Sequence, residues 1–178
     1  MRQYLLFLGL GLLLGLFLEV ELKLVAGLKP EGFIITLFVY PILVTLFYLE
    51  SRIIDKWMTS RWRGDILHYL TVGVFGLAFE WILLGNGPAS NAFQLGMFGM
   101  WTTWGFGPRI LTRQTKHTSY RTFWRAFFIS AVLLTALILL APSPQAKTVI
   151  SVLGLSGTYI IWSIWLLVLG RKSSRQAS

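Results

Sequence analysis

Residues 148–169, TVISVLGLSGTYIIWSIWLLVL, contain no charged side chain. A helix rises about 1.5 Å per residue, so a helix of this length crosses the ~30 Å hydrocarbon core of a bilayer. An open strand would leave backbone groups without hydrogen bonds in lipid, and apolar and polar residues do not alternate here as they do in a membrane barrel. The stretch therefore predicts a transmembrane helix and an all-α protein.

Five earlier apolar stretches extend this pattern over the whole chain, near residues 4–25, 32–49, 66–84, 92–111 and 123–141. The composition agrees, since 55% of the residues are hydrophobic and only 13% are charged, whereas about a quarter of a soluble domain is charged. No small-x-small cleavage site follows the first stretch, so we expect an uncleaved span rather than a signal peptide. The sequence predicts a single domain, 1–178, that forms a compact bundle of six transmembrane helices.

The basic residues divide the predicted connections into two kinds. Thirteen of the 16 Lys and Arg lie before the first span, between the second and third, at or between the fourth and fifth, and in the tail. Only Lys23, Lys29 and Lys147 lie in the other connections, which are short and contain proline. Cytoplasmic loops carry an excess of Lys and Arg, so both termini are predicted to be cytoplasmic, in a plasma (inner) membrane. The basic surface is expected to contact anionic lipid head groups.

The net charge of +9 does not indicate a nucleic-acid partner, because the basic residues lie only between apolar stretches. The absence of cysteine excludes disulfides and thiolate chemistry. Neither His68 nor His117 is followed by a histidine or an acidic residue three or four positions later, so no metal site is predicted. The sequence does not identify a cofactor.

The connection between the second and third spans has a pattern of its own. Ile53, Ile54, Trp57 and Met58 recur at helical spacing between charged residues. This pattern predicts a short amphipathic helix over 51–59 that lies on the inner leaflet. An ordinary loop with interfacial tryptophans is the alternative.

Glu80 is the most informative residue for function. It lies inside the predicted span 66–84, ~8 Å into the outer half of the bilayer. A carboxylate at that depth is costly, so it usually faces protein or water and often marks a functional site. Polar neighbours are expected from the short loop after it and from the outer end of the first span, and aromatic residues are expected as walls. The candidate ligand-binding residues are Glu80, Gln94, Glu19, Asn86, Asn91, Trp81, Trp101 and Tyr40.

This cluster has two interpretations. The functional one is a polar pocket that opens outward and holds a cation, a proton in transit or a polar ligand head group. The structural one is a clasp across the hairpin, in which a neutral Glu80 is hydrogen-bonded to Gln94 or to a backbone carbonyl. Glu19 then lies at the interface, in water.

A second candidate cluster, Asp65, His68 and Arg109, lies at the predicted inner face. Arg109 can pair with Asp65 or with a lipid phosphate. We expect mainly a positive-inside anchor whose side chain extends toward the head groups. Two glycines and Pro108 precede Arg109, and they are expected to break or distort that helix end.

No catalytic motif stands out. Gly154-Leu155-Ser156-Gly157 resembles the serine motif of rhomboid intramembrane proteases. That chemistry needs a histidine base at the same depth, and both histidines lie at or beyond the predicted inner boundary. Only seven Asp and Glu are spread over the chain, so a two-metal lipid enzyme would lack its ligands.

Three functional hypotheses remain. The leading one is a small integral membrane transporter or ligand-binding protein with a polar pocket around Glu80. The first alternative is a structural or assembly subunit of a larger membrane complex, or a homo-oligomer, which the glycine-rich helix faces favour. The second is a membrane-embedded enzyme acting on a lipid or isoprenoid substrate, which needs a second acid beside Glu80 in a lipid-facing cavity.

Overall fold

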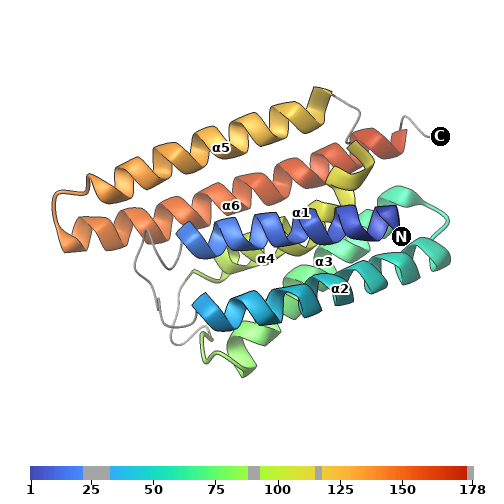
Figure 1. Cartoon of the computed structure of the whole chain (residues 1–178), viewed down its shortest axis with the longest axis horizontal. Helices are drawn as coiled ribbons and strands as arrows, with labels where there is room; N and C mark the ends of the chain where they lie inside the picture. Colours follow the sequence, from blue (N-terminus) through green and yellow to red (C-terminus); the bar gives the residue numbers. More distant parts are fainter. Residues whose placement is uncertain (22–32, 88–92, 115–117, 176–178) are drawn as a thin grey trace.

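The computed structural model describes residues 1–21, 33–87, 93–114 and 118–175 (Figure 1). The described chain is all-helical, as the apolar stretches predicted. The helices are α1 (Arg2–Glu19), α2 (Phe33–Trp57), α3 (Arg61–Ile82), α4 (Gln94–Gln114), α5 (Thr118–Leu139) and α6 (Pro144–Arg175). Four of them, α1, α3, α5 and α6, are long and apolar enough to cross a membrane, which indicates a membrane protein.

Successive helices run in opposite directions, so both termini lie at the same end of the bundle (Figure 1). Helix α4 occupies the centre and packs against α1, α3 and α6, with further contacts to α2 and α5. All residues from Trp101 to Leu111 on α4 are buried. A helix enclosed by other helices needs no apolar surface for lipid, which explains why α4 carries several Gly and Thr residues and two Arg residues.

Glycine sets the distance between α4 and α6. A Cβ atom built on Gly99 would lie 2.8 Å from the backbone nitrogen of Ile160 and 3.0 Å from its Cα atom. Backbone atoms cannot rotate away as a side chain can, so only glycine permits this spacing. Small residues at such crossings are typical of membrane helices, because lipid offers no hydrophobic drive for their association.

Two predicted boundaries differ from the structure at the ends of helices. Residues 51–57 continue α2 rather than forming a separate interfacial helix over 51–59. Helix α4 continues through Pro108 to Gln114, although a break was expected near Arg109. Both continuations have a tertiary cause, because Ser51 and Asp55 on α2 bind Arg109, and the middle of α4 is packed on all sides. Packing of this kind outweighs intrinsic helix preference.

Two helices begin earlier than their apolar stretches. Helix α3 starts at Arg61, and the Ser60 side chain caps it by accepting a hydrogen bond from the Arg63 backbone N–H. Helix α6 starts at Pro144, after Ser143, whose hydroxyl accepts from the Ala146 backbone N–H at 3.1 Å. Serine before the first turn satisfies N–H groups that have no partner within the helix, so these caps are local sequence signals.

Candidate functional site

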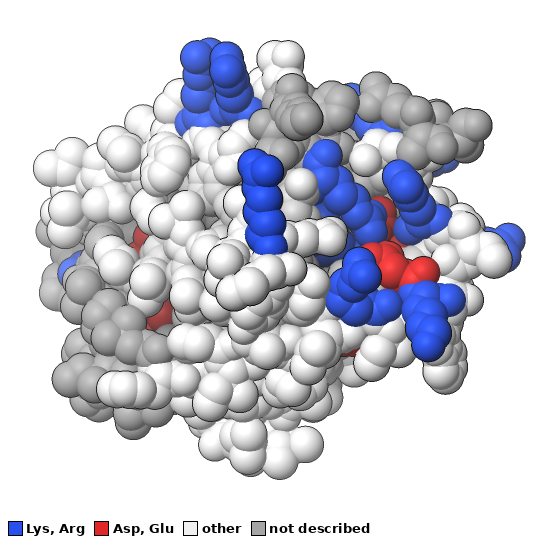
Figure 2. Space-filling model, turned by 45° about the vertical axis from the view of Figure 1, so that its right-hand side comes forward, with Lys and Arg blue, Asp and Glu red and all other residues white. Residues whose placement is uncertain are grey.

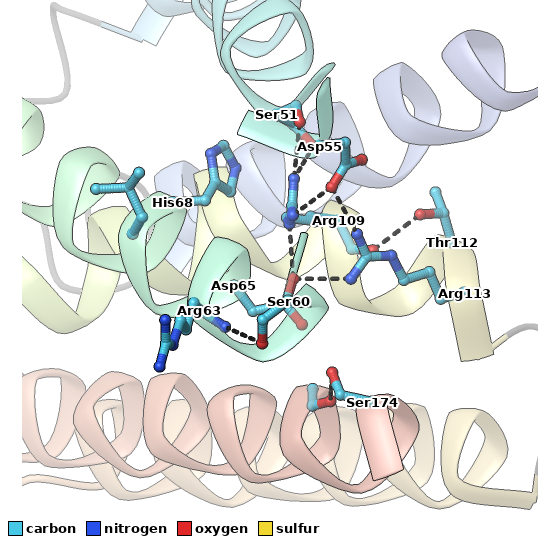
Figure 3. A network of polar contacts seen from close by, with 12 residues as sticks. Ser51, Asp55, Ser60, Arg63, Asp65, His68, Arg109, Thr112, Arg113 and Ser174 are labelled. Atoms are coloured by element: carbon cyan, nitrogen blue, oxygen red, sulfur yellow. Dashed lines mark hydrogen bonds and ion pairs between the residues drawn. The ribbon is translucent and has the colours of Figure 1, made fainter. Parts of the chain in front are cut away.

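Arg109 is the centre of a buried ion-pair network at the end of the bundle that carries both termini (Figure 3). Its Nε atom donates to Asp65 Oδ1 at 2.8 Å, and its Nη2 atom donates to Asp55 Oδ1 at 2.6 Å. Its Nη1 atom donates to the Ser51 carbonyl at 2.9 Å and to the Ser51 hydroxyl at 2.5 Å. One guanidinium group of α4 thereby joins the end of α2 to the start of α3.

Arg113, one turn further along α4, binds the same two carboxylates. It donates to Asp65 Oδ1 at 2.7 Å and to Asp55 Oδ1 at 3.2 Å. Its side chain is 22% exposed, whereas that of Arg109 is only 1% exposed. The two arginines therefore differ in burial while sharing their partners.

The expected head-group anchor at Arg109 is wrong, and the alternative pairing with Asp65 is confirmed. The side chain does not reach the lipid surface because α4 lies inside the bundle and carboxylates approach from α2 and α3. Sequence reasoning missed Ser51 and Asp55 as partners. Their spacing of four residues, which places both on one helix face, was the available signal.

His68 lies next to this network but makes no hydrogen bond to any residue that the structure describes. It is fully buried, and its ring lies 6.1 Å from that of Phe106. Its nearest polar neighbour is Glu50 on α2, with 3.4 Å between Nδ1 and Oε1. The Thr71 hydroxyl donates to the same Glu50 oxygen. Figure 3 shows His68 apart from the dashed contacts around Arg109.

The residues around Glu80 form the second cluster, at the opposite end of the bundle. The Glu80 carboxylate is half-buried and accepts from Asn86 Nδ2 at 2.7 Å and from Trp101 Nε1 at 3.2 Å. Trp81 Nε1 donates to Gln94 Oε1 at 2.6 Å, and Gln94 Nε2 donates to the Asn86 carbonyl at 3.3 Å. The structure thus brings these five residues together, as the short loop predicted.

The structure differs from the predicted cluster in two details. Glu80 bonds to Asn86 and Trp101, whereas the clasp interpretation had named Gln94 or a backbone carbonyl. Glu19 is buried rather than at a water interface, and it accepts a hydrogen bond from the Tyr40 hydroxyl. Asn91 lies outside the described residues.

Glu21 is a buried acid that sequence reasoning did not single out. It follows Glu19 by two residues and accepts from the Tyr159 hydroxyl on α6 at 2.7 Å. Its partner is 138 positions away, inside the uncharged stretch that forms α6. Two acids, separated by one residue at the end of an apolar run, were the only available signal, and they indicated no partner.

Aromatic rings in tilted contact lie between the Glu19 and Glu80 sides of this cluster. The Tyr40 and Trp104 ring centroids are 4.2 Å apart, and those of Trp101 and Trp104 are 4.9 Å apart. The Tyr40 hydroxyl also lies within electrostatic range of both Glu19 and Glu80. We call Glu19, Tyr40, Glu80, Trp101 and Trp104 the acidic cluster.

The described residues hold no group of three or more His, Cys, Asp or Glu arranged to bind a metal ion. Comparison with protein-family models, with curated proteins and with solved structures gives no match for this chain. Fold and site therefore define a class: an all-helical membrane protein with polar clusters at both ends of its bundle. One cluster is an arginine-centred ion-pair network, and the other is built from carboxylates and aromatic rings.

Proposed function

We propose that this chain crosses the membrane six times, with both termini on the cytoplasmic side of the plasma membrane. Basic side chains gathered around the end that carries both termini support this orientation (Figure 2), because cytoplasmic segments are rich in Lys and Arg. The same surface would contact anionic lipid head groups. Helices α2 and α4 are included as spans because each runs antiparallel to the helices before and after it in the chain, and α4 is enclosed by its neighbours.

Labelling of single cysteines tests this topology directly, since the natural chain has none. In intact cells, an impermeant maleimide is expected to label Lys147→Cys at the start of α6. It should label Lys172→Cys at the end of α6 only after the cells are permeabilised. If both variants, or neither of them, are labelled in intact cells, the two ends of α6 do not lie on opposite sides of the membrane. The proposed topology would then be wrong.

We further propose a small transporter or ligand-binding protein whose ligand is a cation held at the acidic cluster. The observation that carries this proposal is the bonding of Glu80. Its carboxylate receives only neutral N–H donors, from Asn86 and Trp101, and no Lys or Arg among the described residues forms an ion pair with it. A carboxylate inside a membrane helix is costly unless a positive charge or a proton compensates it.

The aromatic neighbours suit the same kind of ligand. The faces of Trp and Tyr rings attract cations, and Trp101, Trp104 and Tyr40 lie beside the carboxylates. Neutral donors hold the Glu80 oxygens in place without cancelling their charge. This chemistry favours small inorganic cations or organic ammonium ions over anions or neutral sugars.

Replacing Glu80 by Gln tests the proposal, because Gln retains a carbonyl oxygen that accepts from Trp101 while the negative charge is lost. Calorimetric titrations would use the purified protein in nanodiscs, with Na⁺, K⁺ and tetraphenylphosphonium as probes. We expect wild type to bind at least one of them, and Glu80→Gln to weaken that binding by about tenfold or more, equivalent to ~1.4 kcal/mol.

Lys147→Gln is the matched control, because it changes one charge at the same end of the bundle without touching Glu80. It should bind the probe as wild type does. A folded wild-type protein that binds none of the three cations would overturn the proposal, as would equal affinities of wild type and Glu80→Gln.

A further inference from the structure

Three carboxylates face two guanidinium groups at the cytoplasmic end. Arg109 and Arg113 share Asp55 and Asp65 in four ion pairs, so these charges balance. Glu50 on α2 is the third carboxylate, and no Lys or Arg among the described residues pairs with it. One negative charge is therefore unmatched within this part of the bundle.

His68 is the side chain placed to match that charge. It is 0% exposed, and its Nδ1 atom lies 3.4 Å from Glu50 Oε1. Neither ring nitrogen has a hydrogen-bond partner within the described chain. Buried polar atoms in folded proteins are usually hydrogen-bonded, so these two ring nitrogens call for an explanation.

We propose that Glu50 and His68 form a proton-binding site, in which one proton from the cytoplasmic side converts His68 to imidazolium beside an ionised Glu50. The proton arrives at Glu50, which is 30% exposed, and passes to Nδ1 of the buried ring. Glu50 returns to its anion, so one proton is taken up and no other bond changes. The ring is then a donor at both nitrogens, and Nδ1 lies 3.4 Å from a carboxylate oxygen.

The charged groups at this end of the bundle come from four helices. Glu50 and Asp55 come from α2, Asp65 from α3, and Arg109 and Arg113 from α4. On α6, Arg171 stacks over the Trp62 ring instead, 5.9 Å from its centroid. The arginines are already paired with Asp55 and Asp65, so Glu50 is the carboxylate left to pair with His68.

Thr71 keeps the carboxylate in position for this exchange. Its hydroxyl donates to the Glu50 oxygen that faces His68. The ring itself is held against Phe106 by packing rather than by hydrogen bonds. The site is thus preformed on α2 and α3, and it does not depend on the acidic cluster or on any cation bound there.

Nitrogen NMR of the full chain in nanodiscs tests the proposal, because the protein has only two histidines. The variant His117→Gln, labelled with ¹⁵N-histidine, leaves His68 as the single imidazole. At neutral pH, its two ring nitrogens are expected to show the shifts of a doubly protonated ring. Adding Glu50→Gln should return the ring to a neutral form with one protonated nitrogen at the same pH.

Glu21→Gln is the control, since it removes a buried carboxylate at the other end of the bundle and should leave the His68 signals unchanged. A His68 ring that stays uncharged at both neutral and mildly acidic pH would overturn the proposal. This outcome is measured without any substitution at Glu50. A doubly protonated ring that persists unchanged in Glu50→Gln would also overturn it, because Glu50 would not be the counter-ion. Neither result bears on cation binding at Glu80.

Discussion

Replacing Arg109 by methionine is expected to lower the free energy of unfolding by about 3–5 kcal/mol. The substitution keeps an unbranched chain in the centre of the bundle but removes the buried one of the two guanidinium groups that bind Asp65. Asp65 is 0% exposed, so water cannot take the place of the guanidinium group. The Ser51 hydroxyl and carbonyl would lose their donors at the same time. Unfolding by SDS in mixed micelles measures the change.

Arg113→Met provides the control, because Arg113 contacts the same two carboxylates from a partly exposed position. Its loss should cost about 1 kcal/mol or less, as for exposed ion pairs. The double variant Arg109→Met/Asp65→Leu should recover part of the loss, since removing both buried charges is far less costly than removing one. Equal losses in Arg109→Met and Arg113→Met would show that burial does not govern this network.

The second large effect is expected at Gly99, where alanine should lower the free energy of unfolding by about 1–3 kcal/mol. The added methyl group would lie 2.8 Å from the Ile160 nitrogen and 3.0 Å from the carbonyl carbon of Tyr159. These are backbone atoms of α6, so α4 and α6 must separate to accommodate it. Separation would also weaken the 3.2 Å bond from the Thr103 hydroxyl to the Tyr159 carbonyl.

Gly157→Ala is the matched control on the facing helix. No heavy atom lies within 4 Å of a Cβ built there. Because alanine favours the helix over glycine, this variant should be neutral or stabilise the protein by up to about 1 kcal/mol. The same SDS titration compares the two variants. A loss at Gly157→Ala as large as that at Gly99→Ala would indicate a general glycine effect rather than a close approach.

The polar residues at the Glu80 end of the bundle show how far loop length can predict contacts. Glu80, Asn86 and Gln94 were expected together, because a short loop leaves its flanking residues few other arrangements, and their hydrogen bonds confirm it. The pairs Tyr40–Glu19 and Tyr159–Glu21 join separate helices. No local pattern specifies such pairs, since they depend on which face each helix turns toward its neighbours.

The ends of the helices likewise divide into features that the sequence shows locally and features that depend on contacts with other helices. The capping serines at Ser60 and Ser143 are readable in the sequence, because a cap acts within a few residues. The continuation of α2 to Trp57 is not readable in this way. It depends on Arg109, which approaches from α4 and holds Ser51 and Asp55.

The sequence by itself determined the helical class, the membrane character and the concentration of basic residues toward one end. Hydropathy and charge act along single segments, so these properties need no knowledge of neighbouring helices. Only the tertiary structure decided that Arg109 is buried between carboxylates and that His68 faces Glu50. The physical reason is the central position of α4, which removes polar side chains from lipid and water and leaves other helices to supply their partners.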